Sequence, residues 1–210
     1  MNSQVLPVIV SCKKNEKYWS SILENNKSAI LFYGDPQMDD DYKYDEVTRI
    51  LTLKCCDFYE GLPEKMVSLI NSVLKLECFN KIQYIVKIDD HDIIRKNINM
   101  KYILDVIHKN STKNYLGIRV INVSKIKKKT GTWHFGKCSK GSFWEKRKYT
   151  GPYTSWADGG RGYILSRNSM ENISKIYNFN NLHVIKKHHI CEDLMIALIL
   201  RKFSINPKQL

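Results

Sequence analysis

The chain has 210 residues, 43% of them hydrophobic and 26% charged, which is an ordinary balance for a globular protein with enough apolar material for a core. No apolar run approaches the roughly 20 residues of a membrane-spanning helix, and no basic stretch precedes the first apolar run. We therefore expect no membrane span, no signal peptide and a cytoplasmic protein. Lysine and arginine number 34 against 21 acidic residues, and the net charge of +13 indicates anionic partners such as nucleotides, nucleic acid or an acidic surface. The six cysteines show no C-x-x-C spacing, which favours free thiols in a reducing compartment over disulfides.

Strand-like and helix-like stretches alternate along the chain. The best-supported helix begins at Pro63, because proline suits the first turn of a helix and apolar residues then recur at helical spacing up to Leu76. This alternation predicts an α/β fold with a largely parallel sheet covered by helices on both faces. Strands are expected at residues 5–12, 28–33, 47–53, 84–88, 115–123 and 162–166, and helices at residues 18–25, 63–79, 101–108, 168–177 and 192–203.

A cluster of ionisable residues follows the predicted strand at residues 84–88. Asp89, Asp90, His91 and Asp92 stand in a row there, and ligands of open α/β sheets bind outside the carboxyl ends of the strands. Because carboxylates so close together repel one another, the cluster is tolerable mainly when a positive group lies among them, and a divalent cation is the obvious candidate. A solvated acidic turn, in which Asp90 or Asp92 caps the next segment, is the alternative.

Residues 125–148 form a long segment that is basic, aromatic and glycine-containing, with nine lysine and arginine residues against one glutamate. A loop of this length inside a compact domain is usually functional or disordered, and the tryptophans Trp133 and Trp144 argue against plain disorder. The segment has two interpretations. One is a β-hairpin whose aromatic side chains pack on the core, and the other is a lid that closes over a ligand.

Two further stretches combine residues suited to a binding site. Gly159 and Gly160 precede the predicted strand at residues 162–166, where glycine lets the backbone approach a ligand closely, although an ordinary turn would look the same. Glu192 and Asp193 open the last predicted helix, where acidic residues also complement the helix dipole. The two glycines could therefore belong to an ordinary turn, and the two acidic residues could serve only to stabilise the start of the helix.

In their order and spacing, these stretches resemble the β-1,3-galactosyltransferase and N-acetylglucosaminyltransferase family, glycosyltransferase family 31, which has the GT-A fold. The family has K-x-D-D-D at a strand end, G-x-G-Y-x-L-S at a strand entry and E-D-V later in the chain. The counterparts here are KIDDH at residues 87–91, GRGYILS at residues 160–166 and EDL at residues 192–194. The chain departs from the family where Gly61 and Pro63 replace the Asn and Thr of an N-L-T element, and where His91 replaces the third Asp of D-D-D.

The resemblance implies an α/β fold of the GT-A type, a single domain over residues 1–210 with a mixed, mostly parallel central sheet flanked by helices. Residues 1–92 would form a Rossmann-like half that binds a nucleotide sugar, and residues 93–210 an acceptor-binding and catalytic half. The small size and the composition rich in lysine, asparagine and isoleucine resemble a viral or microbial enzyme, such as one catalytic domain of a longer algal-virus protein.

The implied activity is that of a metal-dependent, inverting hexosyltransferase. Such an enzyme moves a hexose or deoxyhexose from a nucleotide-diphosphate sugar, with a UDP-sugar favoured, to a hydroxyl of a glycan or glycoprotein acceptor. The cofactor would be Mn²⁺ or Mg²⁺, which neutralises the charge of the leaving diphosphate.

The resemblance also assigns roles to individual residues. Asp193 would be the general base that takes the proton of the acceptor hydroxyl, with Glu192 in reserve. The metal would be held by Asp90, His91 and a histidine near the C-terminus, for which His189 is favoured.

Several of these assignments have alternatives. Asp92 could replace a metal ligand, and His183 and His188 are also eligible. Donor binding is expected of Ser11, Lys13, Lys65, Asp89, Asp90, Gly159 and Gly160, and acceptor binding of Trp156 and Asp158.

The alternative function is that of a basic nucleic-acid-binding protein or a metal-dependent nuclease. The net charge of +13 and the lysine-rich, aromatic segment suit single-stranded nucleic acid. Against this, base readout usually relies on arginine, and the segment at residues 125–148 contains only one arginine. A nucleic-acid function also leaves the three ordered motifs unexplained, so we prefer the transferase and expect no nucleic-acid partner.

Overall fold

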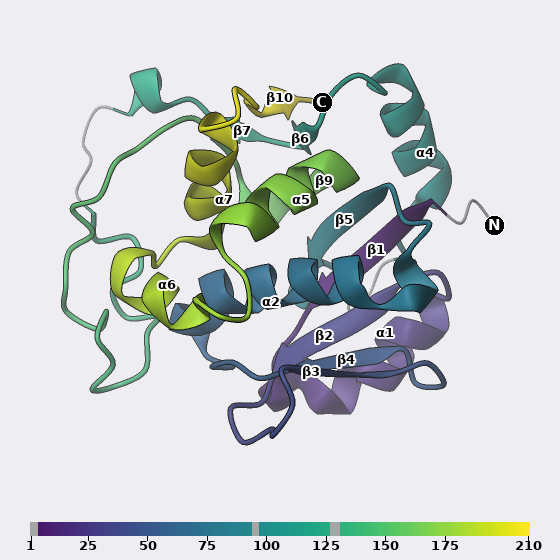
Figure 1. Cartoon of the computed structure of the whole chain (residues 1–210), viewed down its shortest axis with the longest axis horizontal. Coiled ribbons are helices and arrows are strands. Elements are labelled where there is room, and N and C mark those ends of the chain that lie inside the picture. Colours follow the sequence, from purple (N-terminus) through teal and green to yellow (C-terminus); the bar gives the residue numbers. More distant parts are fainter. Residues whose placement is uncertain (1–3, 94–96, 127–130) are drawn as a thin grey trace.

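The computed structural model describes residues 4–93, 97–126 and 131–210, and its centre is one large sheet (Figure 1). The strands of this sheet are β1 (Val5–Val10), β2 (Ile30–Gly34), β3 (Tyr42–Asp45), β4 (Ile50–Leu53), β5 (Tyr84–Asp89), β6 (Tyr115–Gly117), β9 (Tyr163–Ser166) and β10 (Lys208–Gln209). Their order across the sheet is β10-β6-β9-β5-β1-β2-β4-β3. Strands β9 and β3 run antiparallel to the others. A small second sheet pairs β7 (Val120–Ile121) with β8 (Trp156–Ala157).

Helices cover both faces of the large sheet (Figure 1). The main core lies on one face, under α2 (Leu62–Lys75), α5 (Arg167–Ile176), α6 (Leu182–His188) and α7 (Glu192–Arg201). The other face is covered by α1 (Trp19–Asn25) and α4 (Met100–Lys109). Short helical segments complete the chain: η1 (Lys13–Tyr18), η2 (Tyr59–Gly61), η3 (Glu77–Phe79), α3 (Asp90–Ile93), η4 (Val123–Lys125) and η5 (Gly159–Arg161).

The apolar runs explain why the central strands are buried on both faces. Successive side chains of a strand point to opposite faces of the sheet, so Val8 and Val10 of β1 pack in the core beneath α2 while Ile9 packs beneath α1. Strand β5 divides in the same way, with Ile85 in the main core and Val86 in the cluster beneath α4. A strand covered on both faces has no polar side, which is why these stretches read as continuous apolar runs.

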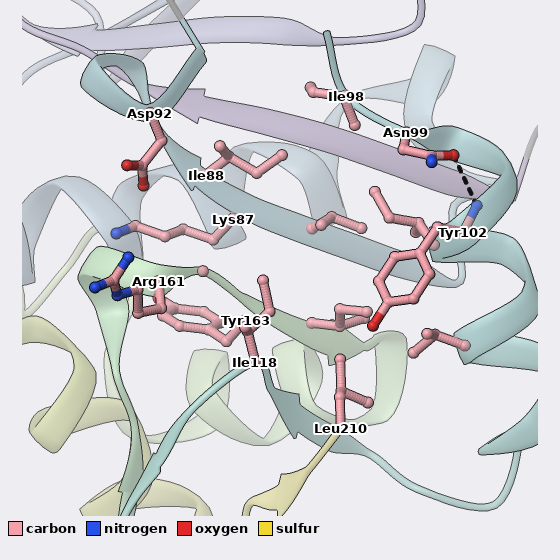
Figure 2. A pocket seen from close by; sticks show the side chains of 15 residues that line it. Lys87, Ile88, Asp92, Ile98, Asn99, Tyr102, Ile118, Arg161, Tyr163 and Leu210 are labelled. Atoms are coloured by element: carbon pink, nitrogen blue, oxygen red, sulfur yellow. Dashed lines mark hydrogen bonds between the residues drawn. The ribbon is translucent and has the colours of Figure 1, made fainter. Parts of the chain in front are cut away.

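An apolar cavity of about 370 Å³ lies between α4 and the sheet (Figure 2). Its walls are mainly aliphatic, and the charged side chains of Lys87, Asp92 and Arg161 gather at one end of it (Figure 2). Glu192 and Asp193 line a different cavity.

The fold class expected from the sequence is confirmed: the protein is α/β, with a mixed, mostly parallel sheet flanked by helices. The single strand predicted at residues 115–123 is wrong. Strand β6 pairs with β9 only up to Gly117. The chain then passes the exposed Ile118 and pairs with β8 in the small sheet as β7. Strands β3 and β10 and helix α6 were not predicted. The single domain and its division near residue 92 stay predictions. Within the described ranges, no helix is long and apolar enough to cross a membrane.

Candidate active site

The acidic cluster predicted from the sequence lies at the carboxyl ends of β1 and β5. These strands are parallel neighbours in register, so the residues that follow them, Ser11 and Asp90, are brought together. The Ser11 hydroxyl donates a hydrogen bond to Asp90 Oδ2 over 2.7 Å, and Asn15 Nδ2 donates to the same oxygen over 2.8 Å. The indole N–H of Trp19 donates to Ser11 Oγ over 2.7 Å. This network orients the carboxylate of Asp90, which is 7% exposed.

A cavity of about 190 Å³ opens beside this network, and we call it the strand-end cavity. Its lining includes Asp89, Asp90 and His91, which are residue types that serve as ligands of divalent cations. The imidazole of His91 is 65% exposed, and its Nε2 lies 3.3 Å from Asp92 Oδ1. The other residues that line the cavity are Val10, Ser11, Cys12, Asp57, Phe58, Tyr59, Leu62 and Lys65.

A buried ion pair between Lys65 and Asp57 supports the strand-end cavity. Lys65 Nζ donates to Asp57 Oδ1 over 2.6 Å, and to the carbonyl oxygens of Ser11 and Asp57 over 3.0 Å and 3.2 Å. The Asp57 carboxylate also accepts from the backbone N–H groups of Lys13 and Gly34. An ammonium has three protons, and Lys65 uses all of them within the protein. Donor binding by Lys65 therefore stays a prediction, and its observed contacts join the ends of β1 and β2 to the approach to α2.

A larger cavity of about 450 Å³ contains Glu192 and Asp193, and we call it the carboxylate cavity. Both residues open α7 and are nearly buried, at 7% and 8% exposed. Asp193 Oδ1 accepts from the backbone N–H of Leu194 over 2.7 Å, and its Oδ2 accepts from the N–H of Gly159 over 2.8 Å. The lining is completed by Tyr59, Leu62, Lys87, Asp89, Ile121, Trp133, Lys137, Tyr153, Trp156, Asp158, Gly159, Gly160, Ile190, Cys191 and Leu194.

The two carboxyl groups have perturbed acidities. Burial raises the pKa of Glu192 to about 7, although the nearby charge of Lys87 works in the opposite direction. The Glu192 Oε1 atom lies 4.0 Å from Lys87 Nζ and accepts a hydrogen bond from the Tyr163 hydroxyl over 2.6 Å. Burial also raises the pKa of Asp193, against hydrogen bonds that favour the ionised form. Shifted carboxyl groups in a cleft are typical of catalytic acid–base residues.

The strand-end cavity and the carboxylate cavity share the residues Tyr59, Leu62 and Asp89 and so form one site with two parts. The predicted residues Trp156, Asp158, Gly159 and Gly160 all line the carboxylate part. The side chain of Asp158 accepts from the Gly160 N–H over 3.1 Å, which holds the η5 turn.

Two predicted site residues, both within the described ranges, line neither part of the site: Lys13 and His189. The Lys13 ammonium pairs with Glu16 over 2.6 Å at the surface. Burial lowers the pKa of His189 to about 4, and its Nε2 lies 3.2 Å from the Tyr177 hydroxyl. In the part of the chain that the structure describes, no three His, Cys, Asp or Glu residues form a group that could hold a metal. The metal assignment of Asp90, His91 and His189 stays a prediction.

Sequence reasoning assigned no role to four residues whose side chains hold groups of the site in place: Asn15, Asp57, Lys87 and Tyr163. Lys87 and Tyr163 stand inside the family motifs at residues 87–91 and 160–166, so their positions carried a signal. Asn15 lies in η1 and Asp57 in the loop before η2, and their contacts span 75 and 44 positions of the chain. No local pattern could reveal contacts of that range.

The basic segment contributes to the wall of the site. In its described parts, residues 125–126 and 131–148, there is no strand, so the β-hairpin interpretation is wrong there, and residues 127–130 lie outside the described ranges. The predicted aromatic packing is confirmed for Trp144, which is 5% exposed and packs with Tyr149, Ile190 and Leu194, but Phe135 and Phe143 are exposed. Trp133 lines the carboxylate cavity.

Comparison with known proteins connects this site to a family. A family model described as Galactosyltransferase matches residues 34–210 of the chain. Among solved structures, the chain is similar to CMP:2-keto-3-deoxy-manno-octonic acid synthetase complexed with CTP. The match covers 99% of this chain and 89% of that chain, with a sequence identity of 9% and a TM-score of 0.45. At this identity and TM-score, nothing about function is drawn from the match. No curated protein sequence matches the chain.

Proposed function

The chain belongs to the galactosyltransferase family, and on that premise we propose that this glycosyltransferase moves a hexose or deoxyhexose from a UDP-sugar to a hydroxyl of a glycan or glycoprotein, with inversion and with a divalent cation. The observation that carries the proposal is the two-part site. One part offers Asp89, Asp90 and His91, the other offers Asp193, and Asp89 belongs to both. A donor and an acceptor in adjoining cavities are what a single displacement requires.

The strand-end cavity suits the nucleotide diphosphate and a cation. The two hydrogen bonds from Ser11 and Asn15 both reach Asp90 Oδ2, and among the described residues none reaches Oδ1. That oxygen and the exposed imidazole of His91 fit Mn²⁺ or Mg²⁺, with further oxygen ligands from the diphosphate. When bound, the cation would neutralise charge that develops on the leaving diphosphate. We assign Asp89 to the ribose or the donor sugar.

The carboxylate cavity suits the acceptor. Trp133, Tyr153 and Trp156 give it apolar walls, and Asp158 and Lys137 add polar groups, a combination typical of small-molecule sites. An acceptor hydroxyl that attacks the donor must lose its proton, and this needs a general base on the acceptor side.

We assign the general base to Asp193 and keep Glu192 as the alternative. Burial makes Asp193 a stronger base than an ordinary aspartate, while hydrogen bonds from Gly159 and Leu194 favour its ionised form. Burial raises the pKa of Glu192 to about 7, so this carboxyl group is only partly ionised near neutral pH.

Thermal unfolding with UDP and Mn²⁺ tests the proposal. A ligand that binds the folded state stabilises it, so UDP with Mn²⁺ should raise the unfolding temperature, and Asp90→Ala should remove the part of the rise that depends on Mn²⁺. Asp105→Ala, on the exposed side of α4, is the matched control and should behave as the wild type. No rise with UDP, together with a rise with oligonucleotides, would contradict the proposal and favour the nucleic-acid function.

A further inference from the structure

Lys87 is a buried lysine whose ammonium lies between the donor side and the acceptor side of the site. It stands on β5 and is 3% exposed. Its Nζ donates to the Asp89 carboxylate and, over 2.8 Å, to the carbonyl oxygen of Gly159, and it lies 4.0 Å from Glu192 Oε1. Figure 2 shows the extended side chain beside the Tyr163 ring, and Nζ lies 5.8 Å from the centroid of that ring.

The backbone of Gly159 extends this network to the proposed base. Its carbonyl oxygen accepts from Lys87, and its N–H donates to Asp193 Oδ2 over 2.8 Å. The ammonium is therefore connected to Glu192 by charge and to Asp193 through the backbone of a single residue, Gly159. Taking an ammonium out of water is costly unless charged and hydrogen-bonding partners compensate, and these partners come from three separate elements: β5, η5 and α7.

We propose that Lys87 is a positioning residue for sugar transfer. Its ammonium joins Asp89 on the donor side to the η5 turn and to the start of α7, and it thereby holds the base carboxylate in position and keeps it ionised. The proposal rests on the proposed function, because it takes Asp193 as the general base. Lys87 would not touch the reacting atoms, and it would act through the groups that it holds.

The charges of the neighbouring groups determine the protonation state of Lys87. Three carboxylates, those of Asp89, Glu192 and Asp193, surround its ammonium. Burial lowers the pKa of Lys87, but Glu192 and Asp89 more than offset this and raise it, so the ammonium stays charged. The other titratable or charged groups that face the two carboxylates of α7 are Tyr59 of η2, Tyr115 of β6, Tyr163 of β9, Cys191, and Asp158 and Lys137 of the cavity wall. Burial raises the pKa of the three tyrosines and the cysteine, so they stay neutral near pH 7.

The sign of the expected effect follows from these charges. The positive charge of Lys87 lowers the pKa of both Glu192 and Asp193, so removing it raises both values. A general base works only when it is ionised. The acidic limb of the pH–rate profile should therefore move to higher pH in Lys87→Met, because the base loses the field of an opposite charge.

The first measurement uses the wild-type protein and needs no activity. The ¹⁵Nζ resonance of Lys87, followed by NMR against pH, should show a step with a midpoint near the Glu192 pKa of about 7. A flat titration would overturn the proposal, because the ammonium would then not sense the carboxylates of α7. This readout also works if Lys87→Met does not fold.

The second measurement is the pH–rate profile of transfer from a UDP-sugar for wild type, Lys87→Met and Tyr163→Phe, with the exposed Lys43→Met as the charge-matched control. Lys87→Met should shift the acidic limb, and Lys43→Met should not. Tyr163→Phe removes a hydrogen bond to Glu192 alone, so it should leave the limb in place if Asp193 is the base. A lower rate for Lys87→Met with an unchanged profile would mean a merely structural role and would overturn the proposal. A clear ¹⁵Nζ step in a protein that transfers from no UDP-sugar would contradict the proposed function and leave the network itself supported.

Discussion

At the scale of single residues, Asp193 lies at the start of a helix and is also our proposed general base. Its Oδ1 accepts from the N–H of Leu194 at the start of α7, and its Oδ2 accepts from Gly159 across the cavity. An acidic side chain at a helix start contributes about 0.3–1 kcal/mol to stability. General base catalysis contributes a factor of about 10²–10⁴ in rate. The two roles therefore predict effects of different kind for the same substitution.

Asp193→Asn should lower the transfer rate by about two to four orders of magnitude, because the amide cannot accept the proton of the acceptor hydroxyl. UDP binding should hardly change, since the diphosphate is assigned to the strand-end cavity. The measurement is turnover, UDP affinity and unfolding temperature on the same variant, with Glu192→Gln beside it. Near-normal turnover with a lower unfolding temperature would leave Asp193 as a helix cap. Loss of turnover in Glu192→Gln alone would make Glu192 the base.

At the scale of elements, the η5 turn (Gly159–Arg161) brings the backbone against the carboxylates of α7. A Cβ added at Gly159 would lie 2.8 Å from Glu192 Oε2 and 3.2 Å from Asp193 Oδ2. The nearest atom belongs to the far end of the flexible Glu192 side chain. The added methyl group can therefore be accommodated without disrupting the fold, but it displaces the carboxylates from their positions. The glycine is needed here for the geometry of the site more than for the turn.

Gly159→Ala should therefore reduce transfer at least tenfold and lower stability only modestly, by about 1–3 kcal/mol at most, the usual range for inserting one methyl group into a packed region. Gly160→Ala is the matched comparison, because its Cβ would meet Asp158 Oδ1 at an ordinary 3.5 Å, and it should lose much less activity. Steady-state turnover and urea unfolding measure both quantities. Equal losses in the two variants would show that the close approach at Gly159 is irrelevant to transfer.

At the scale of the whole molecule, the net charge of +13 attracts anions without selecting among them. The cavities, in contrast, contain paired and oriented charges, such as Lys65 with Asp57 and Lys87 with Asp89. Exposed charges are screened within about a Debye length, roughly 8–10 Å at moderate salt, and buried charges far less. Salt should therefore separate general attraction to anions from recognition in the site.

Raising salt from 50 to 200 mM should abolish most binding to single-stranded oligonucleotides, because each neutralised phosphate adds to the salt dependence. Binding of UDP with Mn²⁺ should fall by much less, since a small ligand in a cavity displaces few counterions. Calorimetric titration at the two salt concentrations measures both. Oligonucleotide binding that persists at the higher salt and competes with UDP would count against the transferase.

The strongest parts of the fold could be predicted from local patterns. Strand β5 follows the predicted boundary within one residue, and α2 begins one residue before Pro63. Both elements have long apolar runs or helical periodicity, which are properties of neighbouring residues. The weak elements have no such pattern: β3 and β10 are four and two residues long, and α6 carries three basic residues in its last turn. These form because tertiary contacts support them.

For the active site, the sequence by itself determined which chemical groups are present and in what order: carboxylates after β5, glycines before β9 and carboxylates at the start of α7. Only the tertiary structure decided which of these groups meet. Ser11 binds Asp90 across 79 positions of the chain, Gly159 binds Asp193 across 34, and Lys87 reaches Gly159 across 72. The same packing directs the Lys65 ammonium to Asp57 and turns His189 toward Tyr177. Contacts of this range depend on sheet order and on how the helices pack, and neither is encoded in the spacing of a motif.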